Sequence, residues 1–191
     1  MSGLSRRQRK ALLVVHVVTS VAWIGLDLVL ITLAAAGLIS GNPELLRAGY
    51  LAMALLGDTV LVPIAMASLV SGVVLSIGTP WGLVKHWWVL VKFGLTMVMV
   101  TAVVFALRPN LSEAAARALQ TPLERLPELG VGQAGLDAMV APSVAMALLL
   151  VATVLSVFKP WGRTRWGRRE QRTTPPARRS VRQPATAGQR G

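Results

Sequence analysis

The dominant pattern along this chain is four long apolar runs separated by shorter polar connections. The runs cover Ala11–Ile39, Leu51–Gly78, Trp87–Leu107 and Val140–Phe158. Because about 20 apolar residues suffice for a helix to cross the hydrocarbon core of a bilayer, each run predicts one membrane-spanning helix. The runs lack the polar stripes of a soluble helical bundle and the alternation of an outer-membrane barrel strand. The pattern therefore predicts an all-α, four-helix transmembrane bundle.

Composition agrees with this interpretation. Of the 191 residues, 53% are hydrophobic and 15% are charged, and the charges gather outside the four runs. The first run follows a basic segment, as the core of a signal peptide does, but it is 29 residues long. Since signal cores have about 7–15 apolar residues, we expect this run to be retained as a span. The absence of cysteine excludes disulfides, iron–sulfur clusters and cysteine nucleophiles.

The placement of lysine and arginine predicts how the spans are oriented. Ser2–Lys10 has four basic residues and no acid, and segment 159–191 has ten basic residues and one acid. The connection between Arg108 and Met139 has three basic residues and four acids. The positive-inside rule puts the two basic segments in the cytoplasm. We therefore expect a multi-pass protein of the inner (plasma) membrane with both termini cytoplasmic.

Composition divides the chain into three parts. A basic N-terminus (1–10) precedes the four-span domain (11–162), and a basic tail (163–191) follows it. The tail lacks apolar periodicity, so we expect it to be disordered and to contact anionic lipid headgroups. Nucleic acid is not an expected partner, because the positive charge lies where the positive-inside rule requires it.

A repeat links the second and fourth runs. The sequence VLSIGTPWG at Val74–Gly82 returns as VLSVFKPWG at Val154–Gly162, with an offset of 80 residues. Both copies end at the same predicted membrane face and run in the same direction. The repeat therefore predicts two parallel helix pairs related by an axis along the membrane normal. Such a relation would give His16 and His86 corresponding positions.

Polar and aromatic side chains form one stripe along the first run. His16, Ser20, Trp23 and Asp27 follow the spacing i, i+4, i+7 and i+11, which puts them on one face of a helix. We expect this face to point into the bundle, because polar groups that face lipid are costly. Asp58 of the second run has a predicted depth close to that of Asp27. The two acids either share a proton or a cation, or, as the default, each is protonated or bonds separately to serine, threonine or backbone groups.

Small residues dominate one face of the second run. Its members are Asp58, Ala65, Ser68, Gly72 and Ser76. Small side chains let helix backbones approach closely, so we expect a packing seam, which could also serve a homodimer. Pro63 should kink this helix, since its ring blocks one backbone hydrogen bond. Arg108-Pro109 is expected to end the third span.

Two histidines and a lysine near the predicted inner surface are the candidate cofactor-binding residues. His16 is either a neutral imidazole bonded to neighbouring groups or a ligand of a metal or haem. His86 belongs to a basic and aromatic interfacial anchor, or supplies a second ligand opposite His16. Lys92 either snorkels to the surface, which we favour, or faces inward and holds an anionic group such as a propionate.

The stretch HVVTSVAWIGLDLVL, followed by GD-x-VLVPIAMASLVSGVVLSIGTPWGLVKHWWVLVKFGLT, resembles the integral membrane proteins of the domain-of-unknown-function family 2269, particularly actinobacterial members. The likeness covers roughly residues 12–107. It implies a four-span inner-membrane protein and carries no established activity. A fainter similarity is to the protoporphyrinogen-oxidase-like and copper-resistance membrane families, which place a histidine before W-x-G in the first span, as His16 and Trp23-Ile24-Gly25 do. With two histidines and no methionine-rich copper motif, the chain fits haem better than copper.

Three classes of function follow from the sequence. The default is a polytopic membrane protein without enzymatic activity. The second is a redox protein that binds haem b through His16, with His86 as a further ligand and Lys92 near a propionate. The third is a small proton- or cation-coupled transporter that uses Asp27 and Asp58.

Overall fold

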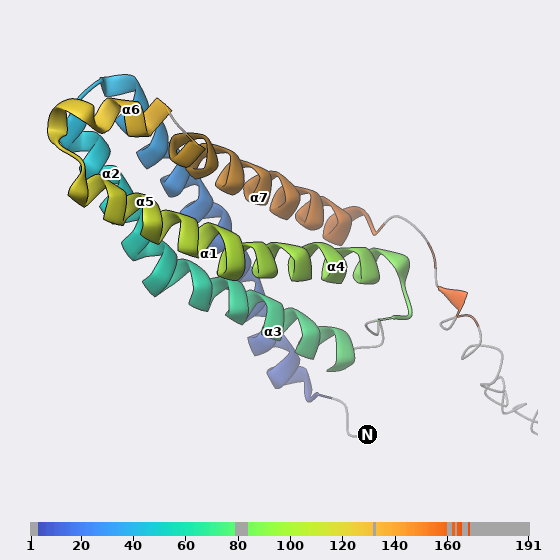
Figure 1. Cartoon of the computed structure of the whole chain (residues 1–191). Helices are drawn as coiled ribbons and strands as arrows, with labels where there is room; N and C mark the ends of the chain where they lie inside the picture. The colour runs from blue at the N-terminus through green and yellow to red at the C-terminus, as the bar shows by residue number, and fades with distance from the viewer. Residues whose placement is uncertain are drawn as a thin grey trace, which may run out of the picture.

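The computed structural model of the chain is an all-helical bundle (Figure 1). It describes residues 4–78, 84–131, 133–159, 162, 164, 165 and 168. Within these ranges, four helical rods are long and apolar enough to cross a membrane: Arg6–Ser40, Pro43–Gly78, Trp87–Gln120 and Gly135–Phe158. This agrees with the predicted four-helix transmembrane bundle. Residues 79–82 of the first repeat copy, residues 160 and 161 of the second copy and most of the tail lie outside the described residues.

The first rod is the single helix α1 (Arg6–Ser40). Ser5 and Gln8 form a capping box at its start, in which each side chain accepts a hydrogen bond from the other residue's backbone N–H. Gly41, in the left-handed conformation with φ of 62°, ends the helix. At 1.5 Å per residue, α1 is about 52 Å long, whereas the hydrocarbon core is about 30 Å thick. One part of α1 therefore lies beyond that core.

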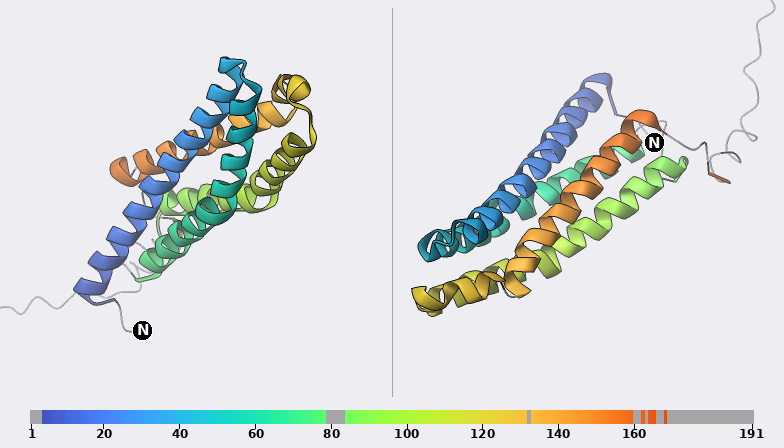
Figure 2. Two further views of the ribbon diagram at one scale, coloured as in Figure 1. Left: turned by 90° about the vertical axis from the view of Figure 1, so that its left-hand side faces the viewer. Right: turned by 90° about the horizontal axis from the view of Figure 1, so that it is seen from above.

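The second and third rods each consist of two α-helices joined by a π-helical turn. They are α2 (Pro43–Leu56), η1 (Gly57–Leu61) and α3 (Val62–Gly78), and then α4 (Trp87–Ala102), η2 (Val103–Leu107) and α5 (Arg108–Gln120). The short helices η3 (Leu123–Arg125) and α6 (Leu126–Val131) lead to α7 (Gln133–Phe158). The start of α1 and the end of α7 lie at one end of the bundle, which we call the basal end (Figures 1 and 2). The opposite end, with α5, α6 and the start of α2, is the distal end.

Helix α1 is the central packing element, because it packs against α2, α3 and α7. Its buried face consists of Trp23, Asp27, Leu30, Ala34 and Gly37. These positions are three or four residues apart, so they lie on one side of the helix. Near the distal end this face meets α2, and towards the basal end it meets α3.

Besides Pro142 inside α7, two prolines lie within the continuous second and third rods, each two residues after a π-helical turn. Pro63 follows η1, and Pro109 follows η2. A proline ring in an α-helix clashes with the carbonyl group four residues earlier. Here those earlier residues, Thr59 and Phe105, belong to the wider π turns, which relieve the clash. The third rod therefore does not stop at Arg108-Pro109, as the sequence pattern predicts, but continues to Gln120.

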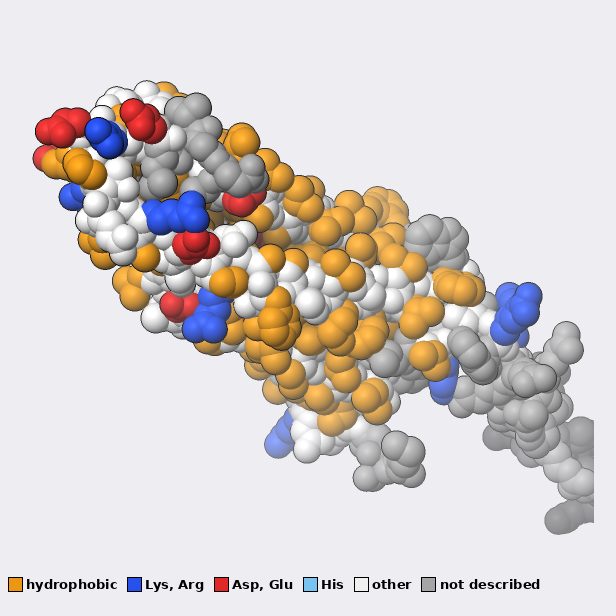
Figure 3. Space-filling view, viewed as in Figure 1, with side chains coloured by type: hydrophobic (Ala, Val, Ile, Leu, Met, Phe, Trp, Pro, Cys, Tyr) orange, Lys and Arg blue, Asp and Glu red, His pale blue; other side chains and the backbone are white. Residues whose placement is uncertain are grey.

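The surface divides in the way a membrane requires. On the face seen in Figure 3, an apolar belt crosses the rods, with acidic and basic side chains at the distal end and lysine or arginine at the basal end. On α1, Val14, Val18 and Val21 are each about 60% exposed: 61%, 60% and 62%. Exposed valines in such a belt are suited to lipid and not to water. The structure thus supports a polytopic membrane protein in contact with a bilayer.

A glycine-to-alanine pair on α1 tests the packing of its distal half. A Cβ atom at Gly37 would lie 2.8 Å from Cδ1 and 3.2 Å from Cα of Leu46, whereas a Cβ at Gly25 meets nothing within 4 Å. We expect Gly37→Ala to lower the melting temperature of the detergent-solubilised protein, because α1 and α2 must move apart. Gly25→Ala should leave it unchanged or raise it, since alanine favours a helix over glycine by about 1 kcal/mol. Equal melting temperatures for the two variants would contradict this packing.

Candidate functional site

The polar stripe of α1 points into the bundle, as predicted, and meets α3. Nδ1 of His16 lies 3.1 Å from the carbonyl oxygen of Ser68 and 3.1 Å from Oγ of Ser71. One turn further, Oγ of Ser20 lies 3.0 Å from Oγ of Ser68. Ser68 and Ser71 are buried. We call these four residues the His16 cluster.

Gly72 makes room for the imidazole ring of His16. A Cβ atom at this position would lie 3.0 Å from Cε1 and 3.4 Å from Nδ1 of the ring. The ring therefore packs directly against the backbone of α3. Gly72, together with the buried Ala65 and Ser68, belongs to the small-residue face that the sequence predicts as a seam, and this part of the face packs against α1.

The hydrogen bonds assign the proton of the neutral His16 ring to Nδ1. The Ser71 hydroxyl donates to the carbonyl oxygen of Ala67 at 2.7 Å, so its oxygen is free to accept from His16. The Ser68 carbonyl can only accept. Nδ1 therefore carries the hydrogen, and Nε2 carries the lone pair. No hydrogen bond to Nε2 is found in the described part of the chain, so this atom is available as a ligand or a proton acceptor.

Lys92 of α4 brings a positive charge close to the His16 cluster. Its ammonium group donates a hydrogen bond to Oγ of Ser156 on α7. It is also near enough to His16 to interact with it electrostatically. Of the two orientations considered from the sequence, Lys92 takes the inward one. Within the described ranges no carboxylate pairs with it.

His86 takes no part in the hydrogen bonds that join the four residues of the His16 cluster. It is the residue that precedes α4, and its ring centroid is 6.4 Å from that of Trp88. Lys92 follows His86 by six residues, which is about 9 Å along a helix. Next to His86, Thr164 donates through its N–H to the Lys85 carbonyl at 2.9 Å. His86 therefore belongs to the segment that leads into α4 at the basal end.

The two acids do not form a pair. Asp27 is fully buried, and neither of its carboxyl oxygens has a hydrogen-bond partner among the described residues. Asp58 is half-exposed and pairs with Arg108, with 2.5 Å between Oδ1 and Nε. Asp58 lies inside η1, and a π-helical turn holds more residues than an α-helical one. The turn rotates Asp58 away from the face that its seven-residue spacing from Ala65 predicts.

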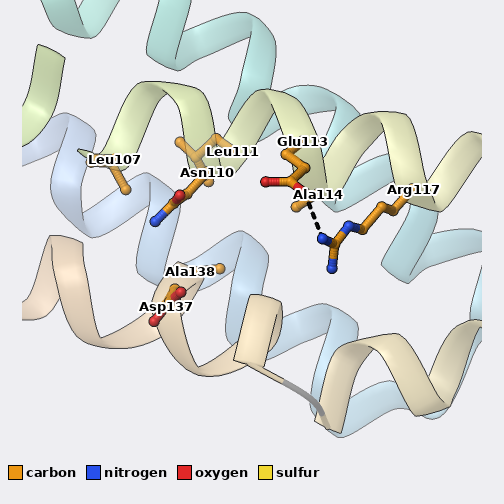
Figure 4. Close-up of a pocket in the computed structure, with 8 residues that line it drawn as sticks. All are labelled: Leu107, Asn110, Leu111, Glu113, Ala114, Arg117, Asp137 and Ala138. Carbon is orange, nitrogen blue, oxygen red and sulfur yellow. Dashed lines mark hydrogen bonds and ion pairs between the residues drawn. The ribbon is translucent and has the colours of Figure 1, made fainter. Parts of the chain in front are cut away.

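A pocket that the sequence pattern does not indicate lies at the distal end (Figure 4). Its volume is about 140 Å³, and it lies between α5 and α7. Asn110, Glu113, Arg117 and Asp137 line it above a floor of leucine and alanine side chains. Arg117 donates to Glu113 at 2.5 Å. The pocket exists because the third rod continues beyond Pro109, where the sequence pattern predicts a helix end.

Comparison with known protein families, with curated proteins and with solved structures finds no match for this chain. In the described part of the chain, no three histidine, aspartate or glutamate side chains group as a metal site. A function must therefore be argued from the chemistry of the His16 cluster itself.

The assigned tautomer of His16 can be measured directly, because the chain has only two histidines. We expect ¹⁵N NMR of histidine-labelled protein to show one neutral ring protonated at Nδ1. His16→Gln should remove this signal, and the matched variant His86→Gln should retain it. A His16 ring protonated at Nε2 would contradict the hydrogen-bond assignment.

Proposed function

We propose that this chain is a four-span membrane protein that binds a b-type haem through Nε2 of His16. The observation that carries the proposal is the way the ring is held, with Nδ1 donating to Ser68 and Ser71. A histidine fixed in this manner is oriented to ligate through its other nitrogen. Imidazole is a common axial ligand of haem iron. A bound haem would supply one-electron redox chemistry.

The charge at the site favours haem over a bare metal ion. Lys92 is positive and lies near His16, and Ser156 is its hydrogen-bond partner. A divalent cation at His16 would be repelled by the ammonium group of Lys92, and the described residues of the His16 cluster include no acid to bind it. Haem has propionate groups, which can pair with an ammonium group by charge-assisted hydrogen bonds. Lys92 is therefore the proposed propionate partner.

The transport hypothesis has less support, because it requires Asp27 and Asp58 to act together. Asp58 is engaged by Arg108 at the distal edge of the apolar belt. By helical rise, Asp58 is about 30 Å from the basal end of α3 at Gly78, which matches the thickness of the hydrocarbon core. The pair is thus suited to the membrane surface.

The proposal includes the orientation of the bundle in the membrane and the membrane in which it lies. The basal end holds Lys10, Lys85 and Lys159, and the basic tail begins there, so we assign it to the cytoplasm. Anionic lipid headgroups would be the partners of these charges. The proposed location is the inner (plasma) membrane, with the basic basal end facing the cytoplasm.

A visible absorbance spectrum of the detergent-purified full chain, from cells supplied with a haem precursor, tests the proposal. We expect a Soret band, with α and β bands after reduction by dithionite. His16→Gly should remove the bands, and added imidazole should restore them. Thr19→Ala, a matched change on the same helix, should retain them. A featureless spectrum of folded wild-type protein would refute haem binding.

The same preparation tests the further ligand. If His86 provides the second axial ligand, His86→Gln should convert a low-spin spectrum into a high-spin one. Our expectation is that His86→Gln leaves the spectrum unchanged, because the His16 cluster is held by α1 and α3, whereas His86 precedes α4. A spin-state change in this variant would restore the two-histidine arrangement.

The proposed role of Lys92 is tested by the affinity of the protein for haem. We expect Lys92→Gln to weaken haem binding roughly tenfold, which corresponds to the loss of about 1.4 kcal/mol. Lys92→Arg should keep most of the affinity, because the positive charge stays. The measurement is a haem titration of the apoprotein. Equal affinities for the glutamine and arginine variants would exclude a role for the charge.

A further inference from the structure

We propose that Asp27 is an internal proton-binding site that exchanges its proton with the basal end of the bundle and not with the distal end. Nothing in this proposal requires haem. It rests on the burial of Asp27, on the missing partner for its carboxyl group, and on the contrast between the two halves of the α1 face on which it lies.

The carboxyl group of Asp27 lacks the partners that an ionised acid needs. Its side chain is 0% exposed, and both oxygens are without a hydrogen-bond partner in the described part of the chain. Taking a carboxylate out of water is costly unless an opposite charge or hydrogen bonds compensate. Asp58 has such compensation in Arg108, and Asp27 does not. The geometry thus requires a bound proton at Asp27.

Polar groups line the α1 face between Asp27 and the basal end. Trp23, one turn below Asp27, is fully buried, and its indole N–H also lacks a partner among the described residues. Ser20 follows and contacts Ser68, which in turn bonds to His16. Asp27 is eleven residues above His16, or about 16 Å. A proton that moves along this face meets a polar group at each turn.

Apolar side chains close the same face towards the distal end. Leu30 is 1% exposed and Ala34 is 4% exposed. Helix α2 covers them with Leu46 and Met53, which are 5% and 1% exposed. Tyr50 is buried in the same cluster and contributes a hydroxyl group. Apolar groups offer no hydrogen-bond partner to a moving proton, so exchange should proceed through the basal half.

Infrared spectroscopy of the full chain in lipid nanodiscs, prepared without haem, tests the bound proton. We expect an absorption in the carbonyl-stretch region of protonated carboxylic acids, which Asp27→Asn removes. Asp27→Glu should shift this band and not remove it, which guards against a variant that fails to fold. If neither substitution alters the region, Asp27 is ionised and the proposal is wrong.

The direction of exchange is tested by following the shift of that band after transfer into D₂O. Ser20→Ala should slow the exchange roughly tenfold, because the barrier rises by about the net value of one hydrogen bond. Tyr50→Phe, which removes the distal hydroxyl, should leave the rate unchanged. Thr32→Val is the matched control on α1 and should leave the rate unchanged, since its hydroxyl donates to the Leu28 carbonyl on an exposed face.

Any other pattern of exchange rates would contradict the proposed direction of proton exchange. Slowing by Tyr50→Phe alone would mean access from the distal end, and equal rates in all variants would mean that the polar face is not the path. Because these spectra need no haem, they separate this proposal from the proposed function. A chain that shows no Soret band can still show the Asp27 band.

Discussion

The cost of an unsatisfied polar group in hydrocarbon is the constraint on which this bundle depends. Most hydroxyl groups in the apolar belt avoid this cost within their own helix, by donating to the carbonyl oxygen four residues earlier. Thr19, Thr59 and Thr153 do so at 2.9, 2.7 and 2.9 Å. His16 has no such local solution, so its bonds to Ser68 and Ser71 fix how α1 sits on α3.

This constraint also explains why the site lies where it does. The Nδ1 atom of His16 is satisfied by α3, and the ammonium of Lys92 is satisfied by Ser156 of α7. Among the described residues, the buried groups left without a hydrogen-bond partner are the carboxyl group of Asp27 and the indole N–H of Trp23, and no hydrogen bond to Nε2 of His16 is found there. At each of these groups, the chain itself provides fewer hydrogen-bond or charge partners than a polar group in hydrocarbon needs. A bound ligand or a bound proton would provide the missing partners.

The sequence predicts the parts of the structure that depend on helical periodicity alone. Four apolar runs predict four rods, and the spacing from His16 to Asp27 predicts a stripe that faces inward. Periodicity fails at Asp58, because η1 changes the register between that residue and Ala65. It also fails at Pro109, since the π turn before it allows the helix to continue.

The orientation of Lys92 depends on a contact that no local pattern reveals. Its partner Ser156 is 64 residues away in the chain, and the serine is placed by the packing of α7 against α4. A lysine at that depth has two acceptable solutions, snorkelling or an internal partner, and only the tertiary structure decides between them. The distal pocket is unpredictable for the same reason, because its walls come from α5 and α7.

The distance along the chain between His16 and its partners has a consequence for biosynthesis. The carbonyl group that accepts from His16 belongs to a residue 52 positions later. At a synthesis rate of about 5–20 residues per second, roughly 3–10 seconds separate the two residues at the ribosome. During that interval the first span has its polar stripe and no second helix to cover it. The first two spans are therefore expected to enter the lipid together, as a helical hairpin. Its two helices should pack against each other before the hairpin moves away from the site of synthesis.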